Sequence, residues 1–195
     1  MSTAVVIDGV AHAAPKGFYH GTHRTAPPER TLERINRVAP VVGLTRLADI
    51  TGLDRIGIPT VVGHRPNAPT LAVSGGKGFT TLAATVSAGM EAVEIWHAEN
   101  LLLDVEHTSH DELHRQGLTM PADLLPITRN ALFDPHRPEP WVWGWDVVAQ
   151  RRTAVPYACV SMGNTDHRPT RRWMPFAAGS NGLAGGNHLL ESVAA

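Results

Sequence analysis

The sequence is poor in cysteine, in excess charge and in long apolar runs. Cys159 is the one cysteine among 195 residues, which excludes an intrachain disulfide framework and favours a reducing cytoplasm. The formal net charge is −1, so the composition gives no support for nucleic-acid or membrane-surface binding. No apolar stretch approaches the roughly 20 residues of a membrane helix, and the N-terminus lacks the basic segment of a signal peptide. We therefore expect a cytoplasmic protein that binds neither membranes nor nucleic acids.

Hydrophobic residues make up 43% of the chain, which is enough to build a core and excludes general disorder. The length suits one domain, so we expect residues 1–195 to form a single unit with a flexible segment at 1–15. Helical and extended patterns alternate, but hairpins are also visible. The sequence therefore predicts a mixed α/β fold, of the α+β kind with hairpins, rather than a doubly wound one.

The expected elements follow from apolar periodicity and from glycine and proline positions. Residues 1–28 read as loop. Ser109 and Glu112 form a capping box for a short helix that Gly117 ends. The other elements are a helix at 30–43, two extended segments between 43 and 66, a strand running into the glycine turn at 74–78, a helix at 79–103, a hairpin within 141–162 and a terminal helix.

Two glycine-rich stretches, "SGGKG" at 74–78 and "SNGLAGGN" at 180–187, each precede a helix that carries a carboxylate. Backbone N–H groups at a helix N-terminus favour a phosphate, and Lys77 would add a positive charge. The P-loop spacing is absent, so an ordinary turn remains the alternative for "GGKG". The repeated arrangement indicates two halves of one site.

Ser87, Glu91 and Glu94 are spaced i, i+4, i+7 and share one stripe of the expected long helix. The two glutamates repel each other unless a cation lies between them. Mg²⁺ takes one or two carboxylates together with phosphate oxygens, so the stripe is compatible with a metal–nucleotide site. A solvated helix face is the alternative, although Gly89 and its small neighbours would leave room for a ligand.

Other polar and aromatic clusters have simpler interpretations. Cys159 has no basic partner nearby in the sequence and reads as a core thiol on a strand. His107, His110 and His114 lack zinc-motif spacing. No Ser-His-Asp pattern can be argued. The three tryptophans, Trp141, Trp143 and Trp145, can belong to the core or form a binding face. The three arginines, Arg168, Arg171 and Arg172, can lie in a solvated loop or contact a peptide or nucleotide.

The order of several stretches along the chain resembles the YcaO family. The matching pieces run from about Lys16 to the last residue and are "GTHRTAPPERTLERI", "GLTRLADITGLDRIGIP", "RPNAPTLAVSGGKG", "SAGMEAVEIWHAE", "WVWGWD", "VPY" and "SNGLAGGNHLLE". Each piece alone is weak, but their combination in family order is specific. An unrelated kinase-like transferase is disfavoured because every kinase motif is missing.

The resemblance implies ATP-dependent activation of a peptide amide. In YcaO enzymes a nucleophile adds to a backbone carbonyl, ATP phosphorylates the resulting oxygen, and loss of phosphate gives an azoline or a thioamide. Cofactors would be ATP and Mg²⁺. Matching positions imply Ser87 and Asn187 near the nucleotide, Glu91, Glu94 and Glu191 as metal ligands, and Lys16 and Arg24 as basic groups near the phosphates. Lys77 joins this set from its glycine-rich turn.

The sequence also departs from the family pattern. Ile95 stands where the family has Arg after the second acid, and family members continue beyond "NHLLE". We therefore expect a partial YcaO domain: a truncated gene product, a fragment or part of a split enzyme, with little or no ATP turnover of its own. Expected partners are a peptide or protein substrate, a protein for substrate recognition or sulfur delivery, and further copies of the chain. The alternative is a catalytically incomplete nucleotide- or partner-binding module, or one that a second polypeptide completes.

Overall fold

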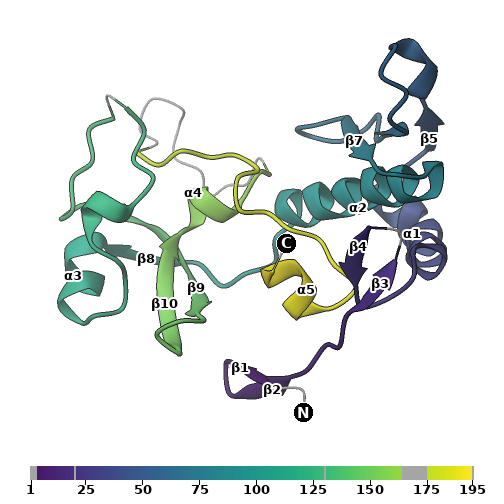
Figure 1. The fold of residues 1–195 in the computed structure, drawn as a ribbon. Coiled ribbons are helices and arrows are strands. Elements are labelled where there is room, and N and C mark those ends of the chain that lie inside the picture. Colours follow the sequence, from purple (N-terminus) through teal and green to yellow (C-terminus); the bar gives the residue numbers. More distant parts are fainter. Residues whose placement is uncertain (1–3, 20, 130, 164–174, 195) are drawn as a thin grey trace. The chain divides into compact units, whose positions relative to one another are not determined.

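The computed structural model describes residues 4–19, 21–129, 131–163 and 175–194 (Figure 1). Within these ranges the chain divides into two compact units. Unit 1 is built around residues 13–97 and 182–194, and unit 2 around residues 4–12 and 98–181. Both units mix helices with small antiparallel sheets, as the sequence predicts. No helix of the described residues is long and apolar enough to cross a bilayer.

Unit 1 contains a hairpin, a three-stranded sheet and three helices. The hairpin is β3 (Gly17–Tyr19) with β4 (Thr22–Arg24), and the sheet has the antiparallel order β5 (Arg46–Asp49), β6 (Thr60–His64), β7 (Val73–Lys77). A 3₁₀ turn, η1 (Thr51–Leu53), lies between β5 and β6. The helices are α1 (Pro28–Val42), α2 (Thr81–Glu99) and α5 (Leu189–Val193). The predicted helices at 30–43 and 79–103 are thus confirmed, with shifted ends.

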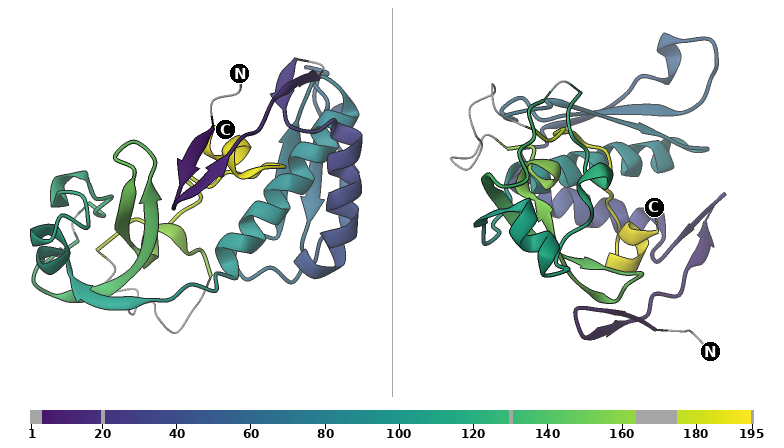
Figure 2. Two further views of the ribbon diagram at one scale, coloured as in Figure 1. Left: turned by 90° about the horizontal axis from the view of Figure 1, so that it is seen from below. Right: turned by 90° about the vertical axis from the view of Figure 1, so that its left-hand side faces the viewer.

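Local sequence explains both ends of α1. Pro28 stands at the first helical position, where its missing N–H costs nothing. Gly43 ends the helix in the left-handed conformation with φ of 70°, and its N–H donates to the Ala39 carbonyl. Between these ends, Ile35 is 1% exposed and packs in one cluster with Ala92 of α2. The two helices lie side by side next to the sheet (Figure 2).

The glycine pair before α2 lies within a strand, which corrects the prediction of a glycine turn there. β7 includes both Gly75 and Gly76, and only Gly78 to Thr80 separate it from the helix. A Cβ on Gly76 would lie 2.1 Å from the Ala84 carbonyl oxygen of α2. The helix backbone therefore approaches so closely that only glycine fits at this strand position.

Unit 2 is built on a second three-stranded antiparallel sheet, in the order β10-β9-β8. The predicted hairpin within 141–162 is confirmed as β9 (Pro138–Asp146) and β10 (Arg151–Pro156), and the chain then enters α4 (Tyr157–Val160). The remaining elements are β8 (Glu106–Ser109), α3 (His110–Arg115), η2 (Ala122–Leu124) and the hairpin of β1 (Val5–Ile7) with β2 (Val10–His12). The expectation of loop throughout residues 1–28 is therefore wrong, because two short hairpins lie there.

The tryptophan at 141 belongs to the core of unit 2. Its side chain is 1% exposed, and its Nε1 donates to the Thr108 carbonyl at 3.0 Å. Trp143 is partly buried against the same cluster. Cys159 also packs there, but in α4 rather than on a strand, and burial raises its pKa to about 11. The interpretation of a core thiol agrees with this position, whereas Arg168, Arg171 and Arg172 lie outside the described residues.

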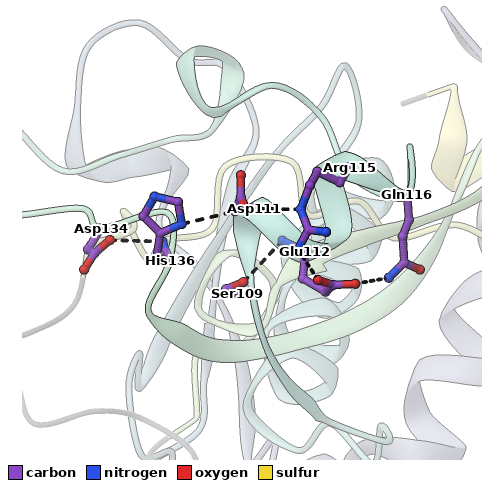
Figure 3. Close-up of polar contacts among 7 residues, drawn as sticks. All are labelled: Ser109, Asp111, Glu112, Arg115, Gln116, Asp134 and His136. Carbon is purple, nitrogen blue, oxygen red and sulfur yellow. Dashed lines mark hydrogen bonds and ion pairs between the residues drawn. The ribbon is translucent and has the colours of Figure 1, made fainter.

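The serine half of the predicted capping box of α3 is confirmed, whereas the Glu112 carboxylate accepts from Arg115 and Gln116. The Ser109 hydroxyl accepts from the Glu112 N–H at 3.2 Å (Figure 3). Arg115 pairs with both Asp111 and Glu112 on the exposed side of this helix. His110 stacks on His114, and its Nε2 lies 3.0 Å from the Met120 carbonyl oxygen. His110 is buried at 5% exposure, so its ring packs in the interior of unit 2.

Candidate functional site

A cavity of about 480 Å³ lies within unit 1 and falls in the size range of small-molecule sites. Its walls come from β3 and β4, from the turn after β7, from α2 and from residues 183–191. Seven of the eight predicted site residues line it: Arg24, Lys77, Ser87, Glu91, Glu94, Asn187 and Glu191. Lys16, which the structure describes as exposed, lies outside the lining. The two predicted halves of one site therefore meet around a common space.

The α2 wall carries Ser87, Glu91 and Glu94 on one side of the helix. Glu91 Oε2 accepts from the Gly75 N–H of β7 at 2.8 Å, which fixes this carboxylate at the strand edge. Burial raises the pKa of Glu94, and the negative charge of Glu91 raises it further, while a backbone hydrogen bond from Gly185 lowers it. The charge of Glu91 thus disfavours the ionised form of Glu94, an effect that a cation between the two carboxylates would relieve.

Another part of the cavity lining is Glu191, whose side chain is almost completely enclosed. Glu191 is 2% exposed, and its Oε2 accepts from the Thr25 N–H at 2.9 Å and from the Thr25 hydroxyl at 2.5 Å. Arg24 Nη1 lies 3.7 Å from Oε1. Burial alone would raise the pKa of Glu191, but the Thr25 hydrogen bonds, the Arg24 charge and the Asn187 N–H together hold it below its usual value. The buried carboxylate is therefore ionised and well supplied with donors.

Asn187 is fixed by the first half of α1. Its Oδ1 lies 3.0 Å from Arg34 Nη1 and 3.2 Å from the Thr31 hydroxyl. Its Nδ2 donates to the same hydroxyl at 3.0 Å. Thr31 is 3% exposed, so these bonds form away from bulk water. The N-terminal segment thereby sets the position of a residue more than 150 positions later in the chain.

The second glycine stretch reaches α2 closely instead of forming a helix start. A Cβ on Gly185 would lie 3.2 Å from Glu94 Oε2 and 3.3 Å from Met90 Cε, so a larger residue would push this segment away from α2. α5 begins only after His188, whose Nδ1 accepts from the Leu190 N–H at 3.1 Å. Gly185 therefore serves close approach to α2, whereas Gly182 lies in a turn with φ of 87°, six residues before the N-cap residue of α5.

Three polar residues that hold Glu191 and Asn187 in place were not singled out from the sequence: Thr25, Thr31 and Arg34. Thr25 and Thr31 lie within the "GTHRTAPPERTLERI" stretch but carry no charge that would mark them. One signal was present. Thr31 precedes Ile35 by four positions, so it occupies the buried stripe of α1, and a polar residue there must find a partner.

The donor set fits a magnesium–nucleotide complex in part. Among the described residues no three His, Cys, Asp or Glu side chains form a metal-binding group. Glu91 and Glu94 remain as a pair on one helix, which matches the Mg²⁺ preference for one or two carboxylates plus phosphate oxygens. Lys77 and Arg24 supply positive charge in the same cavity. Glu191 already accepts from Thr25 and Asn187, so its availability as a third ligand stays a prediction.

Comparisons with known proteins place the chain in a family and a fold. A family model described as "YcaO cyclodehydratase, ATP-ad Mg2+-binding" matches residues 75–195. An uncharacterised protein of Mycobacterium tuberculosis is 37% identical over 176 residues, which are 89% of this chain and 39% of that protein. An uncharacterised protein in the tfuA 3′ region of Rhizobium leguminosarum bv. trifolii is 34% identical over 176 residues, 90% of this chain and 40% of that protein.

Two solved structures share the fold. A structure of YcaO from Methanopyrus kandleri bound with AMPPCP and Mg²⁺ has a TM-score of 0.66 and 25% identity, and covers 92% of this chain and 44% of its own. A heterocyclase in complex with substrate and cofactor has a TM-score of 0.70 at 21% identity, over 88% of this chain and 26% of its own. The chain spans about two fifths of the length of the curated relatives it matches, from 39% to 42%.

Proposed function

This chain belongs to the YcaO family, and on that premise we propose that its unit 1 cavity binds Mg·ATP for the activation of a peptide backbone amide. The single observation that carries the proposal is the meeting of seven predicted residues around one cavity of about 480 Å³. These residues come from three separate stretches of the chain, at position 24, at 77–94 and at 187–191. A chance likeness of scattered motifs would not bring them together.

Within the proposed complex the residues divide into two groups by charge. Glu91 and Glu94 would hold Mg²⁺, since they stand one turn apart on α2 and Glu94 is disturbed by its neighbour's charge. Lys77, Arg24, Ser87 and Asn187 offer N–H and O–H donors suited to phosphate oxygens. ATP supplies the phosphoryl group that turns an amide oxygen into a good leaving group. The part of the protein is to position the reactants and to neutralise phosphate charge.

Azoline or thioamide formation is the proposed outcome of this activation, within peptide modification. The proposal extends to a peptide or protein substrate, to a partner protein for substrate recognition or sulfur delivery, and to self-association. A cytoplasmic location accords with the single cysteine. The family likeness supports peptide modification in general, and the choice between the two products depends on which nucleophile reaches the activated carbon.

A second candidate is a Mg-nucleotide-binding module that another polypeptide completes. The observation favouring it is that, within the described residues, no third His, Cys, Asp or Glu side chain forms a metal-binding group with Glu91 and Glu94. In this case the chain would bind nucleotide but show little peptide-dependent phosphate release. The two candidates share the cavity and differ in turnover.

Calorimetric titration of the purified chain with Mg·ATP tests the shared step. We expect Glu91→Gln to weaken binding by about tenfold or more, as loss of a group that supports a bound metal commonly does. Glu33→Gln, an exposed acid on α1, is the matched control and should leave affinity unchanged. Equal affinities for the wild type and Glu91→Gln would refute the metal assignment. Phosphate release on addition of a candidate peptide then separates the two candidates.

A further inference from the structure

The amide of Asn187 is held by three hydrogen bonds, and the bond to Arg34 differs in kind from the other two. The other two go to the Thr31 hydroxyl, at 3.2 Å from Oδ1 and 3.0 Å from Nδ2. The Thr31 hydroxyl also lies 3.3 Å from the Pro27 carbonyl oxygen, to which it can donate while it accepts from Nδ2, so Thr31 would be satisfied by either orientation of the amide. Arg34 Nη1 lies 3.0 Å from Oδ1. A guanidinium only donates, so Arg34 tolerates the oxygen and excludes the amide nitrogen.

Arg34 therefore decides which end of the amide faces α1. Turning the side chain by 180° would place Nδ2 against the guanidinium, with donor against donor, at partly buried positions. Without that guanidinium the two orientations would differ little in energy, because Thr31 accommodates both. The orientation is thus fixed by a residue that is itself outside the cavity lining.

The fixed orientation determines what Asn187 offers to a ligand. Within the described part of the chain, Oδ1 has donors from Arg34 and Thr31, and Nδ2 uses one hydrogen for Thr31. The capacity left over is the second Nδ2 hydrogen, and Asn187 lines the cavity. An N–H suits an anionic phosphate oxygen, whereas the lone pair of a turned amide would repel it.

We propose that Arg34 is a positioning residue that orients Asn187 so that an amide N–H, and not the carbonyl oxygen, is presented to a phosphate group. The proposal rests on the proposed binding of Mg·ATP in this cavity. Arg34 acts through Asn187 and does not touch the ligand itself.

Arg34 contributes little to the packing of α1, which allows its positioning role to be measured. The helix is anchored in the core by Ile35 and Val42, at 1% and 4% exposure, whereas Arg34 is only half-buried. Arg37 lies one turn further along the same helix and is exposed. Arg34→Met and Arg37→Met therefore remove the same charge from the same helix, and only the first removes the donor to Asn187.

The test compares wild type, Arg34→Met, Arg34→Lys and Arg37→Met by two measurements. Calorimetry gives the dissociation constant for Mg·AMPPCP. The side-chain ¹H–¹⁵N resonances of Asn187, assigned by their loss in Asn187→Ser, report the amide orientation without any nucleotide. We expect Arg34→Met to weaken Mg·AMPPCP binding about tenfold, the effect of one charge-assisted contact, and to move the Asn187 amide resonances. Arg34→Lys keeps a donor-only group and should stay within about threefold of wild type.

Several results would overturn the proposal. Equal losses of affinity for Mg·AMPPCP in Arg34→Met and Arg37→Met would assign the effect to the positive charge of the helix and not to the bond with Asn187. If the Asn187 amide resonances do not move in a folded Arg34→Met chain, Arg34 does not set the orientation of the amide. If folded Arg34→Lys loses as much affinity for Mg·AMPPCP as Arg34→Met does, a donor at position 34 is not what matters. If the wild type does not bind Mg·AMPPCP, the proposed function fails by itself, and the amide resonances still decide the role of Arg34. If Arg34→Met does not fold, its role is structural and the positioning proposal is overturned.

Discussion

Glu191 accepts hydrogen bonds from the backbone N–H and the hydroxyl of Thr25, a residue 166 positions earlier, at 2.9 and 2.5 Å. This contact joins the segment before α1 to the first turn of α5. A five-residue helix is marginal on its own, so α5 depends on such tertiary contacts. The buried carboxylate of Glu191 therefore helps to stabilise α5, whether or not it also binds a metal.

Thr25→Ala should destabilise the chain by about 1–3 kcal/mol, because it removes a hydroxyl donor from an enclosed carboxylate. Urea unfolding at neutral pH measures this loss, and Thr25→Ser should restore most of it. Thr22→Ala, at an exposed position of β4, is the matched control. A loss in Thr22→Ala as large as that in Thr25→Ala would assign the effect to the hairpin and not to the Glu191 contact.

The same contact makes a prediction about acid. The pKa of Glu191 lies below the ordinary value of 4.5 in the folded chain, so its ionised form contributes stability above pH 4.5. That contribution is lost as the pH falls from 4.5 through the lower folded pKa. The free energy of unfolding should therefore drop less steeply with acid in Glu191→Gln than in wild type below pH 4.5. Parallel curves for the two proteins would contradict the lowered pKa.

Glu94 should behave in the opposite sense. Because burial and the charge of Glu91 raise the pKa of Glu94, its ionised form is disfavoured in the folded chain near neutral pH. The stability associated with its protonated form is present below its ordinary pKa and is lost as the pH rises through the folded value. Glu94→Gln should thus raise the melting temperature of the ligand-free chain at pH 7, by about 1–2 °C since the site is partly exposed to solvent.

Mg²⁺ provides the complementary measurement for Glu94. The wild-type chain with nucleotide should melt at higher temperature when Mg²⁺ is added, and Glu94→Gln should lose most of that increase. Glu33→Gln should keep it. A full increase in Glu94→Gln would remove this residue from the metal assignment.

The two adjacent glycines of β7 should respond differently to alanine. A Cβ on Gly76 would meet the Ala84 carbonyl oxygen at 2.1 Å and the Ala88 nitrogen at 2.2 Å, and helix backbone cannot move aside. Gly76→Ala should cost about 3 kcal/mol or more in unfolding free energy, or prevent folding. A Cβ on Gly75 would point into open space, so Gly75→Ala should change the free energy of unfolding by less than about 1 kcal/mol. Similar stabilities for the two variants would contradict the close approach of β7 and α2.

Cys159 should resist modification in the folded chain. Its pKa of about 11 leaves roughly a hundredfold less thiolate at pH 8 than the ordinary value of 9. Because the chain has no other cysteine, a chromogenic disulfide reagent reports this thiol alone. The rate in buffer should be about a hundredfold or more below that in concentrated urea, and equal rates would exclude a buried thiol.

Local spacing was sufficient to predict one wall of the site and insufficient for the other. Ser87, Glu91 and Glu94 share one helix, so periodicity alone places them on one stripe. The contacts of Asn187 with Thr31 and Arg34 join residues 156 and 153 positions apart, and no local pattern encodes such a pairing. The family likeness pointed to Asn187 and Glu191, but the residues that hold them became visible only in the structure.

The glycine stretches show a second limit of sequence reasoning. Gly-Gly is typical of turns, so "SGGKG" predicted a turn, yet the pair lies inside β7 because α2 packs against it. The tertiary neighbour, not the local propensity, decided the conformation. Lys16 illustrates the reverse case: a position matched by family order lies outside the cavity lining that the other seven residues share.

The distance along the chain between Thr25 and Glu191 also bears on how the protein is made. At about 5–20 residues per second, a ribosome needs roughly 8–30 s to add the residues that separate them. From the completion of α2 to the end of that interval, the newly synthesised chain carries Glu91 and Glu94 but lacks Glu191. The lining of the cavity is therefore incomplete until synthesis has passed position 191.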